Sequence, residues 1–349
     1  MNIPVQNIYY LLAYAWDRLE EAEAFNRGTT SFQNIFDLLA KVLVNGTTHL
    51  LKRGLDRNYQ EEETLTSKLR GKVLFQQSIK ENVLVKASAY CAFDELSYDI
   101  LHNQLLKATL KRLTKEQALD KSIQDEIHLL LQRLPNEITA KPVKLSDFKR
   151  VQLHRNNNHY KLLLSICKLI WRELLSTEET GEFPFKSFVE DEKRMANLFE
   201  RFLFNFYKKH LPSNEWLVKR ETLTWQLQPL LHSDDLNYIP AMKTDISLVS
   251  KDRYIIMDAK YYPEALKGQY NKEKIISPNL YQIFSYTQNL TNAYNKQIEG
   301  ILIYPEVTKV LSLSYKFQPG NKAHIKVCTI NLNQAWQGIE SDLLKIVGY

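Results

Sequence analysis

The sequence predicts an α/β protein with two domains: a mainly helical N-terminal domain with a small β element, and a C-terminal domain in which helices flank a central mixed sheet. Three observations lead to this prediction. The chain has 349 residues, which is long for a single hydrophobic core. Apolar residues recur at helical spacing through most of residues 1–175, whereas helical and strand-like runs alternate over residues 190–349. Residues 176–184 are polar and acidic and contain glycine and proline, so a linker is predicted over residues 176–189.

The N-terminal domain is predicted to consist mainly of helices. Pro4 suits the first turn of a helix, and Ile8 and Leu12 follow it at helical spacing. The same pattern predicts helices over residues 4–25, 31–51, 99–113, 115–134 and 160–175. Short apolar runs predict strands over residues 72–75 and 83–90. Residues 141–155 are irregular and basic, which fits either a solvated loop or a patch that contacts phosphates.

The C-terminal domain shows a more specific order of elements. A helix over residues 190–210 is followed by a strand over 216–225 and a strand hairpin within 243–262. A lysine-rich loop over 263–274 then leads into a helix over 278–290 and a strand over 300–304. Two further strands, 311–317 and 324–332, precede a last helix over 333–347. The predicted order is therefore α-β-β-β-α-β with additions.

The hairpin within residues 243–262 carries the most informative chemistry. Asp245 stands near the start of its first strand, and Asp258 and Lys260 follow the apolar run of its second strand. Side chains two residues apart project from the same face of a strand, so Asp258 and Lys260 are neighbours. Two carboxylates and a lysine together suit a magnesium-dependent phosphodiesterase. The alternative is an ordinary amphipathic hairpin with a structural Asp–Lys pair.

Composition and absent motifs exclude several other classes. With 44% hydrophobic and 25% charged residues and a net charge of +6, the chain resembles soluble proteins, and a polyanionic partner is compatible but not required. Three widely spaced cysteines disfavour a disulfide scaffold or a zinc site. Neither a signal peptide nor a membrane-spanning run is recognisable, so a cytoplasmic location is expected. No phosphate-binding loop, H-E-x-x-H or G-x-S-x-G motif occurs.

The order of elements, with Asp245 on one strand and Asp258-x-Lys260 on the next, resembles the PD-(D/E)xK nucleases. The resemblance implies that Asp245 and Asp258 bind Mg²⁺ and that the backbone carbonyl of Ala259 is a further ligand. Glu200, on the helix over residues 190–210, would hold a second metal or a metal-bound water; the alternative is an exposed helix glutamate. The chain departs from the motif at Thr244, which stands where the motif has proline, without loss of a ligand.

The resemblance also assigns roles to residues that do not bind metal. Lys260 would orient or activate the attacking water and stabilise the pentavalent transition state. Gln282 and Tyr286 are four residues apart, hence on one face of the helix over residues 278–290. They would position the DNA strand or the lysine. For Tyr286 and Gln282, packing on the helix surface is the alternative interpretation.

Motifs in both halves resemble the McrC subunits of McrBC-type restriction systems. They lie at residues 3–16, 69–73, 93–99, 244–246, 258–262 and 279–282. This resemblance implies a nuclease subunit that acts with a separate ring-forming AAA+ GTPase, the McrB-like partner. The partner would bind GTP and recognise modified cytosine in double-stranded DNA, while this chain cuts the DNA and its N-terminal domain stimulates GTP hydrolysis.

Two other functions remain open at this point. One is an activator of a AAA+ ring that has a nuclease fold but does not cleave, and the intact set of Asp245, Asp258 and Lys260 disfavours it. The other is a stand-alone DNA repair nuclease. The aromatic N-terminal segment and the absence of a recognisable base-reading module disfavour that function.

Overall fold

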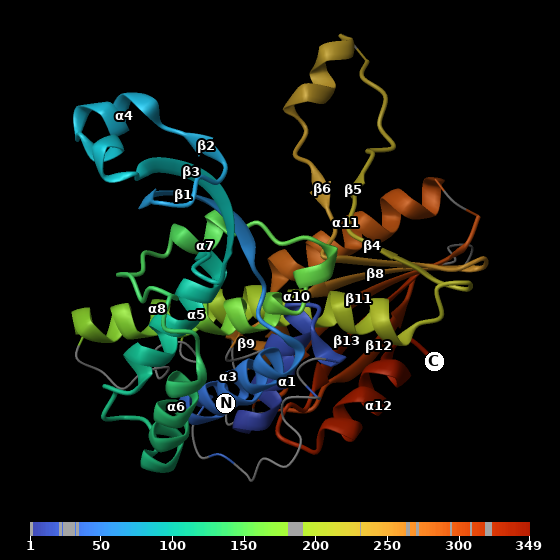
Figure 1. Ribbon diagram of the computed structural model, residues 1–349. Coiled ribbons are helices and arrows are strands. Elements are labelled where there is room, and N and C mark those ends of the chain that lie inside the picture. Colours follow the sequence, from blue (N-terminus) through green and yellow to red (C-terminus); the bar gives the residue numbers. More distant parts are fainter. Residues whose placement is uncertain are drawn as a thin grey trace. The chain divides into compact units, whose positions relative to one another are not determined.

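The computed structural model of the protein describes residues 3–20, 23, 32, 35–180, 191–230, 232–262, 266–269, 272–293, 295–307, 309–317 and 323–349 (Figure 1). Contacts divide the chain into two compact units. The sheet unit comprises residues 1–24, 28–38 and 185–349, and the helical unit comprises residues 25–27 and 39–184. Within these described ranges, no helix is both long and apolar enough to cross a membrane.

The sheet unit contains a six-stranded mixed sheet, as the sequence predicts. Its strands run in the order β12-β13-β11-β8-β7-β4. The three central strands β13, β11 and β8 are parallel, and the outer strands pair antiparallel. Strand β8 and most of β11 are buried on both faces, which explains their nearly continuous apolar sequences. The bounds are β4 (Leu217–Lys219), β7 (Ile246–Val249), β8 (Arg253–Ala259), β11 (Gln297–Pro305), β12 (Ser312–Lys316) and β13 (His324–Ile330).

Helices cover both faces of this sheet (Figure 1). Helix α11 (Ser277–Ala293) packs closely on β11, where a Cβ atom at Gly300 would lie only 2.6 Å from the Thr287 side chain. Helices α10 (Glu192–His210), α12 (Trp336–Ile346) and α1 (Val5–Ala15) pack together on the other face. The Tyr10 ring of α1 stacks on Trp336 of α12 at 4.6 Å between centroids. The predicted fold class, including the α-β-β-β-α-β order, is therefore confirmed.

Shorter elements of the sheet unit differ from the prediction. The predicted strand over residues 216–225 is divided into β4 and β5 (Thr222–Leu223), and β5 pairs with β6 (Met242–Lys243). A 3-10 helix, η3 (Ser233–Tyr238), lies between β5 and β6. The predicted loop over residues 263–274 contains a hairpin of β9 (Leu266–Gln269) and β10 (Lys272–Ile275).

Helix α1 belongs to the sheet unit, whereas the predicted division places residues 1–175 in one domain. The Asn7 amide donates to the carbonyls of Leu332 and Gln334 at 2.9 and 2.8 Å. The helix ends at Ala15 rather than near residue 25, because Asp17 adopts a positive φ of 57°. The packing of this helix is therefore decided by its contacts with residues that are distant in the sequence. The spacing of apolar residues along the chain does not reveal such contacts.

The predicted linker over residues 176–189 is only partly described. Helix α8 (Tyr160–Thr180) continues into it through residue 180, and residues 181–189 lie outside the described residues. The division between the two units falls after residue 184, within the predicted linker.

The helical unit contains the predicted helices with shifted ends. They are α5 (Leu101–Leu113), α6 (Lys121–Arg133) and α8, and α3 (Ile35–Arg53) contributes most of its length. The basic segment over residues 141–155 contains the short helix α7 (Asp147–Arg150) and the first residue of η2 (Arg155–Asn157). Buried polar residues on these helices include Thr109, whose hydroxyl accepts from the Trp171 indole at 2.9 Å.

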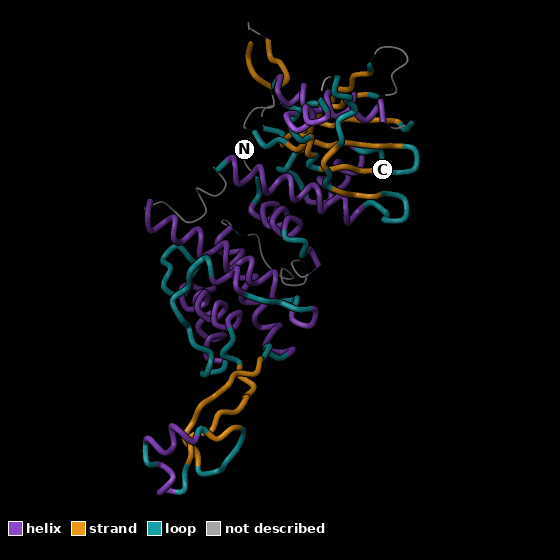
Figure 2. Tube along the Cα trace, turned by 90° about the horizontal axis from the view of Figure 1, so that it is seen from above, coloured by secondary structure: helices purple, strands orange, loops and turns teal. Residues whose placement is uncertain are grey.

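A small sheet extends from the helices of this unit, and we call residues 58–97 the arm (Figure 2). Strand β3 (Ala89–Ser97) lies between β1 (Asn58–Thr66) and β2 (Lys72–Val73), and α4 (Phe75–Lys80) and η1 (Val83–Lys86) lie at the far end. The predicted strands over residues 72–75 and 83–90 are wrong in extent. Residues 83–86 form a 3-10 turn, and β1 escaped prediction because it is exposed on both faces and lacks apolar alternation.

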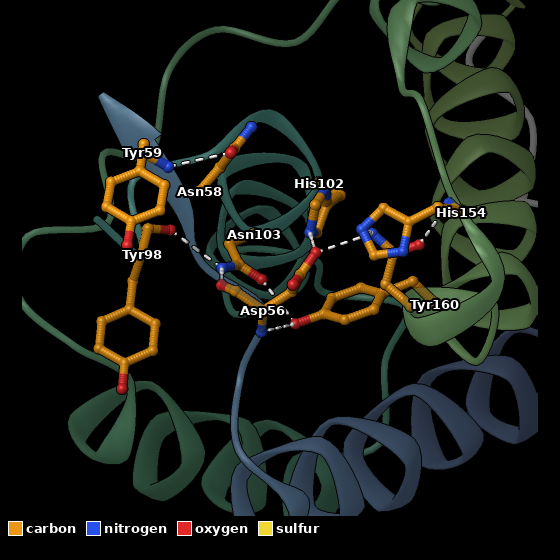
Figure 3. A network of polar contacts seen from close by, with 9 residues as sticks. Asp56, Asn58, Tyr59, Tyr98, His102, Asn103, His154 and Tyr160 are labelled. Atoms are coloured by element: carbon orange, nitrogen blue, oxygen red, sulfur yellow. Dashed lines mark hydrogen bonds and ion pairs between the residues drawn. The ribbon is translucent and has the colours of Figure 1, made fainter. Parts of the chain in front are cut away.

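The base of the arm is fixed by a polar network around Asp56 (Figure 3). The Asp56 carboxylate accepts from Asn157 at 2.7 Å and lies 3.0 Å from His102 Nε2. Asn103 donates to the carbonyls of Asp56 and Tyr98, both at 2.9 Å, so it joins the two ends of the arm. Burial lowers the pKa of His102. The network therefore anchors both ends of the arm to α5 and to the segment that precedes α8.

A second polar network, in the sheet unit, supports a stability prediction. Glu299 on β11 is 1% exposed and lies 3.1 Å from Arg253, 3.2 Å from His324 and 2.5 Å from Lys326. Burial alone would raise its pKa, but hydrogen bonds and charge from His324, Lys326 and Arg253 hold the pKa at about 2. The ionised carboxylate is thus strongly favoured by the folded state.

We expect Glu299→Gln to lower the free energy of unfolding by about 3 kcal/mol at neutral pH, because the cations Arg253 and Lys326 lose a buried counter-charge. The folded pKa lies below that of the unfolded chain, so this contribution is complete above about pH 4.5 and is lost as the pH falls towards 2. Urea unfolding of the wild type and the variant, from neutral pH down to about pH 2, measures this contribution. The control is Glu215→Gln, because Glu215 is exposed. Equal losses in both variants would contradict the prediction.

Candidate active site

Strand pairing brings Asp245 and Asp258 together. Strands β7 and β8 are antiparallel, with Ile246 opposite Met257. Continuing this register by one residue places Asp245 opposite Asp258, and opposed residues share a face of the sheet. The carboxylate of Asp245 accepts a hydrogen bond from the backbone N–H of Ala259 at 3.0 Å. The two acids that the sequence predicts as a pair are therefore adjacent in space.

The Asp258 carboxyl group is unusually poorly stabilised as an anion. Its residue is 2% exposed, and it lies 3.0 Å from Lys260 Nζ. Burial raises its pKa to about 7, and Asp245 adds to this effect while Lys260 opposes it. Two carboxyl groups held this close, one of them buried, attract additional positive charge.

Lys260 begins a chain of hydrogen bonds that ends on the backbone. Its ammonium group donates to Gln282 Oε1 at 3.3 Å, and Gln282 Nε2 donates to the Tyr286 hydroxyl at 3.2 Å. The Tyr286 hydroxyl in turn donates to the carbonyl of Lys243 at 3.0 Å. Gln282 and Tyr286 lie on the same face of α11, as their spacing predicts, and that face meets the lysine.

Lys260 itself is held in its charged form. Burial alone would lower its pKa, but the neighbouring carboxylates, Asp258 first and then Asp245, raise it above the usual value. An ammonium group is a hydrogen-bond donor and a source of positive charge, not a proton acceptor. A charged Lys260 can therefore orient a bound group or stabilise negative charge, but it is not suited to accept a proton.

Glu200 lies near this cluster but has a partner of its own. One of its oxygens is 3.0 Å from a guanidinium nitrogen of Arg220. Burial raises the pKa of Glu200, and the negative charge of Asp245 raises it further. Arg220 was not among the residues predicted from the sequence, where nothing distinguishes it from other surface arginines. An ion pair between α10 and the segment after β4 becomes visible only in three dimensions.

A divalent metal would have two carboxylates available here. Among the described residues, no group of three or more His, Cys, Asp or Glu side chains is arranged to hold a metal ion. Mg²⁺ commonly binds through one or two carboxylates and keeps several waters, so the pair Asp245 and Asp258 fits this ion better than zinc. Because burial raises the pKa of Asp258, an added cation beside its carboxyl group would stabilise the ionised form.

Comparison with known proteins gives consistent results for nearly the whole chain. The model of a family described as McrBC 5-methylcytosine restriction system component matches residues 5–305. The type IV methyl-directed restriction enzyme EcoKMcrBC of Escherichia coli (strain K12) is 33% identical over 344 residues, which are 99% of this chain and 97% of that protein.

A solved structure shows that a similar fold occurs in a large protein assembly. It is the refined half-complex from the tetradecameric assembly of Thermococcus gammatolerans McrB AAA+ hexamers with bound McrC. The match has a TM-score of 0.59 at 17% identity and covers 98% of this chain and 76% of that one. Identity this low supports the fold alone, whereas the family match and the E. coli relative establish the kinship. The chain therefore belongs to the family of McrBC 5-methylcytosine restriction system components, as its resemblance to McrC subunits predicts.

Proposed function

We propose that this chain is the Mg²⁺-dependent endonuclease subunit of a GTP-driven restriction complex that cleaves DNA containing modified cytosine. The observation that carries the proposal is the cluster of Asp245, Asp258 and Lys260 at the end of β8. In this cluster, a carboxylate oxygen of Asp258 lies 3.0 Å from Lys260 Nζ. Family membership supplies the restriction context. The E. coli relative bears the name of a methyl-directed restriction enzyme, which supports a modified DNA substrate.

The residues of the cluster divide the chemistry among them. Asp245 and Asp258 would hold Mg²⁺, with the backbone carbonyl of Ala259 as a further ligand and Glu200 as a ligand for a second ion or for water. When bound, Mg²⁺ supplies Lewis acidity and positive charge at the scissile phosphate. Lys260, kept as an ammonium by the two carboxylates, orients the attacking water and neutralises charge on the pentavalent phosphorus. Gln282 holds Lys260 in place.

The proposed partner is a ring-forming AAA+ GTPase that resembles McrB. In the Thermococcus gammatolerans assembly, McrC is bound to McrB AAA+ hexamers. In this chain the arm is the best candidate for that contact, because large apolar side chains at its far end are exposed: Leu69, Phe75, Ile79 and Val85. Exposed apolar groups gathered at one end of the arm are typical of a protein-binding surface. GTP would be bound by the partner and not by this chain.

A cleavage assay tests the proposed function. The chain is mixed with its partner GTPase and a duplex that contains 5-methylcytosine, and GTP, Mg²⁺ and the partner are omitted in turn. We expect cleavage only with all components present. Cleavage by the chain alone would favour a stand-alone repair nuclease, and stimulated GTP hydrolysis without any cleavage would favour a non-cleaving activator.

A further inference from the structure

The backbone around Asp245 contains an irregularity that bears on how this residue is placed. In the pairing of β4 with β7, Lys219 lies opposite Ser247. In the pairing of β5 with β6, Thr222 lies opposite Lys243. Residues 220–221 on one side therefore face residues 244–246 on the other, which is one residue more. An extra residue in one of two paired strands is a β-bulge, and such bulges redirect side chains.

Thr244 closes this bulge through both its backbone and its side chain. Its N–H donates to the carbonyl of Glu221 at 2.9 Å. The return bond, from the N–H of Glu221, goes to the Thr244 hydroxyl oxygen at 3.2 Å. That hydroxyl also donates to the Glu221 carbonyl at 3.3 Å and accepts from the Ser247 hydroxyl at 3.0 Å. Its one donor and two acceptor positions are thus all used.

The hydroxyl here takes the place that a backbone carbonyl has in a regular ladder. In a hydrogen-bonded antiparallel pair, the two residues exchange N–H to carbonyl bonds. Because the Thr244 hydroxyl accepts the bond from Glu221, the main chain is able to turn after Thr244 without leaving that N–H unpaired. The next residue, Asp245, is the one whose carboxylate accepts from Ala259 N–H.

Glu221, the anchor on the other side, is itself tied to the strand that carries Asp258. Its carboxylate accepts from the Tyr254 hydroxyl at 2.5 Å and pairs with Lys219 at 2.7 Å. Tyr254 is buried on β8, the strand that ends with Asp258 and Ala259. Thr244 is therefore linked through Glu221 and Tyr254 to the same strand that presents the second carboxylate.

We propose that Thr244 is a positioning residue for Asp245: its hydroxyl closes the bulge that sets the separation of the Asp245 and Asp258 carboxylates, and so sets the affinity of the site for a divalent cation. The inference rests on the proposed function, since it concerns the same metal site. Thr244 is 5% exposed, and its hydroxyl bonds to Glu221 and Ser247. Residues that orient a metal ligand typically change metal affinity about 10–100-fold when they are replaced.

The test compares Thr244→Val, which removes the hydroxyl at nearly constant shape, with Thr244→Ser, which keeps it. Mn²⁺ binding to the full chain is measured by electron paramagnetic resonance of the free ion, with Asp258→Ala as the variant that lacks a ligand. We expect the Mn²⁺ dissociation constant of Thr244→Val to rise about tenfold, and that of Thr244→Ser to stay within about twofold of the wild type. In the assembled complex, the Mg²⁺ concentration for half-maximal cleavage should shift by the same factor, with the rate at saturating Mg²⁺ retained.

Thr291→Val is the matched control, since the Thr291 hydroxyl donates to the carbonyl of Thr287 within α11. A Thr244→Val variant that loses thermal stability but keeps wild-type Mn²⁺ affinity and Mg²⁺ dependence would overturn the inference, because its role would be structural alone. The proposed function would survive that result if Asp258→Ala still abolished cleavage. If the wild-type chain neither binds Mn²⁺ nor cleaves with Mg²⁺, the proposed function fails and the inference fails with it.

Discussion

Asp258→Ala is expected to reduce DNA cleavage by the assembled complex by about 10³-fold or more, while stimulation of the partner's GTP hydrolysis stays at the wild-type level. The substitution removes one of the two carboxylates that would hold Mg²⁺ and the counter-charge of Lys260, from which it is separated by 3.0 Å. The GTPase effect should persist because the proposed partner contacts lie on the arm, in the other unit of the chain.

The same substitution should not destabilise the free chain. Burial raises the pKa of Asp258 even though Lys260 opposes the shift, so the buried carboxylate costs the folded chain more than its pairing with Lys260 returns. Thermal unfolding without metal measures this. Asp252→Ala is the control, since Asp252 is exposed in the turn at the opposite end of the β7–β8 hairpin. Undiminished cleavage by Asp258→Ala would refute the assignment of the active site.

The second large effect is expected from shortening the arm. Gln60 and Glu95 are cross-strand partners in β1 and β3, so residues 61–94 can be replaced by a two-residue Asn-Gly turn that suits such a hairpin. The shortened chain loses the exposed apolar tip but keeps the network around Asp56 at the base of the arm. We expect stimulation of GTP hydrolysis to fall to the basal rate of the partner, as measured by phosphate release.

The shortened chain should also lose DNA cleavage, because the proposed nuclease acts only when it is bound to its partner GTPase. Two single substitutions test the exposed apolar tip without shortening the arm. Phe75→Ser removes an exposed ring from the tip, whereas Glu62→Gln changes an exposed residue midway along β1. We expect only Phe75→Ser to weaken stimulation. Full stimulation by the shortened chain would place the partner contact elsewhere.

The structure also changes which truncation is informative. Removing residues 1–175, the predicted N-terminal domain, would take α1 away from the sheet unit. That helix contributes the Asn7 bonds to Leu332 and Gln334 and the stacking of Tyr10 on Trp336. Such a truncation would damage the sheet unit as well as remove the arm, so shortening the arm is the more specific experiment.

The arrangement of the candidate site was largely predictable from local spacing. A period of two places Asp258 and Lys260 on one face of a strand, and a short hairpin brings a second acid opposite the first. A period near 3.6 does the same for Gln282 and Tyr286. These relationships depend on neighbouring residues along the chain, so the sequence alone contains them. The roles of these residues in catalysis stay predictions until the variants are measured.

Contacts between residues that are far apart in the sequence became visible only in the folded structure. The ion pair of Glu200 with Arg220, the packing of α1 beside α12 and the bulge closed by Thr244 all join segments whose spacing carries no periodic signal. Strand β1 escaped prediction for a related reason, since a strand exposed on both faces has no apolar alternation to reveal it. Local patterns along the chain were enough to predict the fold class, the family resemblance and the pairing of Asp258 with Asp245 and Lys260. Only the folded chain determined which side chains hold those residues in place, because such contacts follow from three-dimensional packing and not from spacing along the chain.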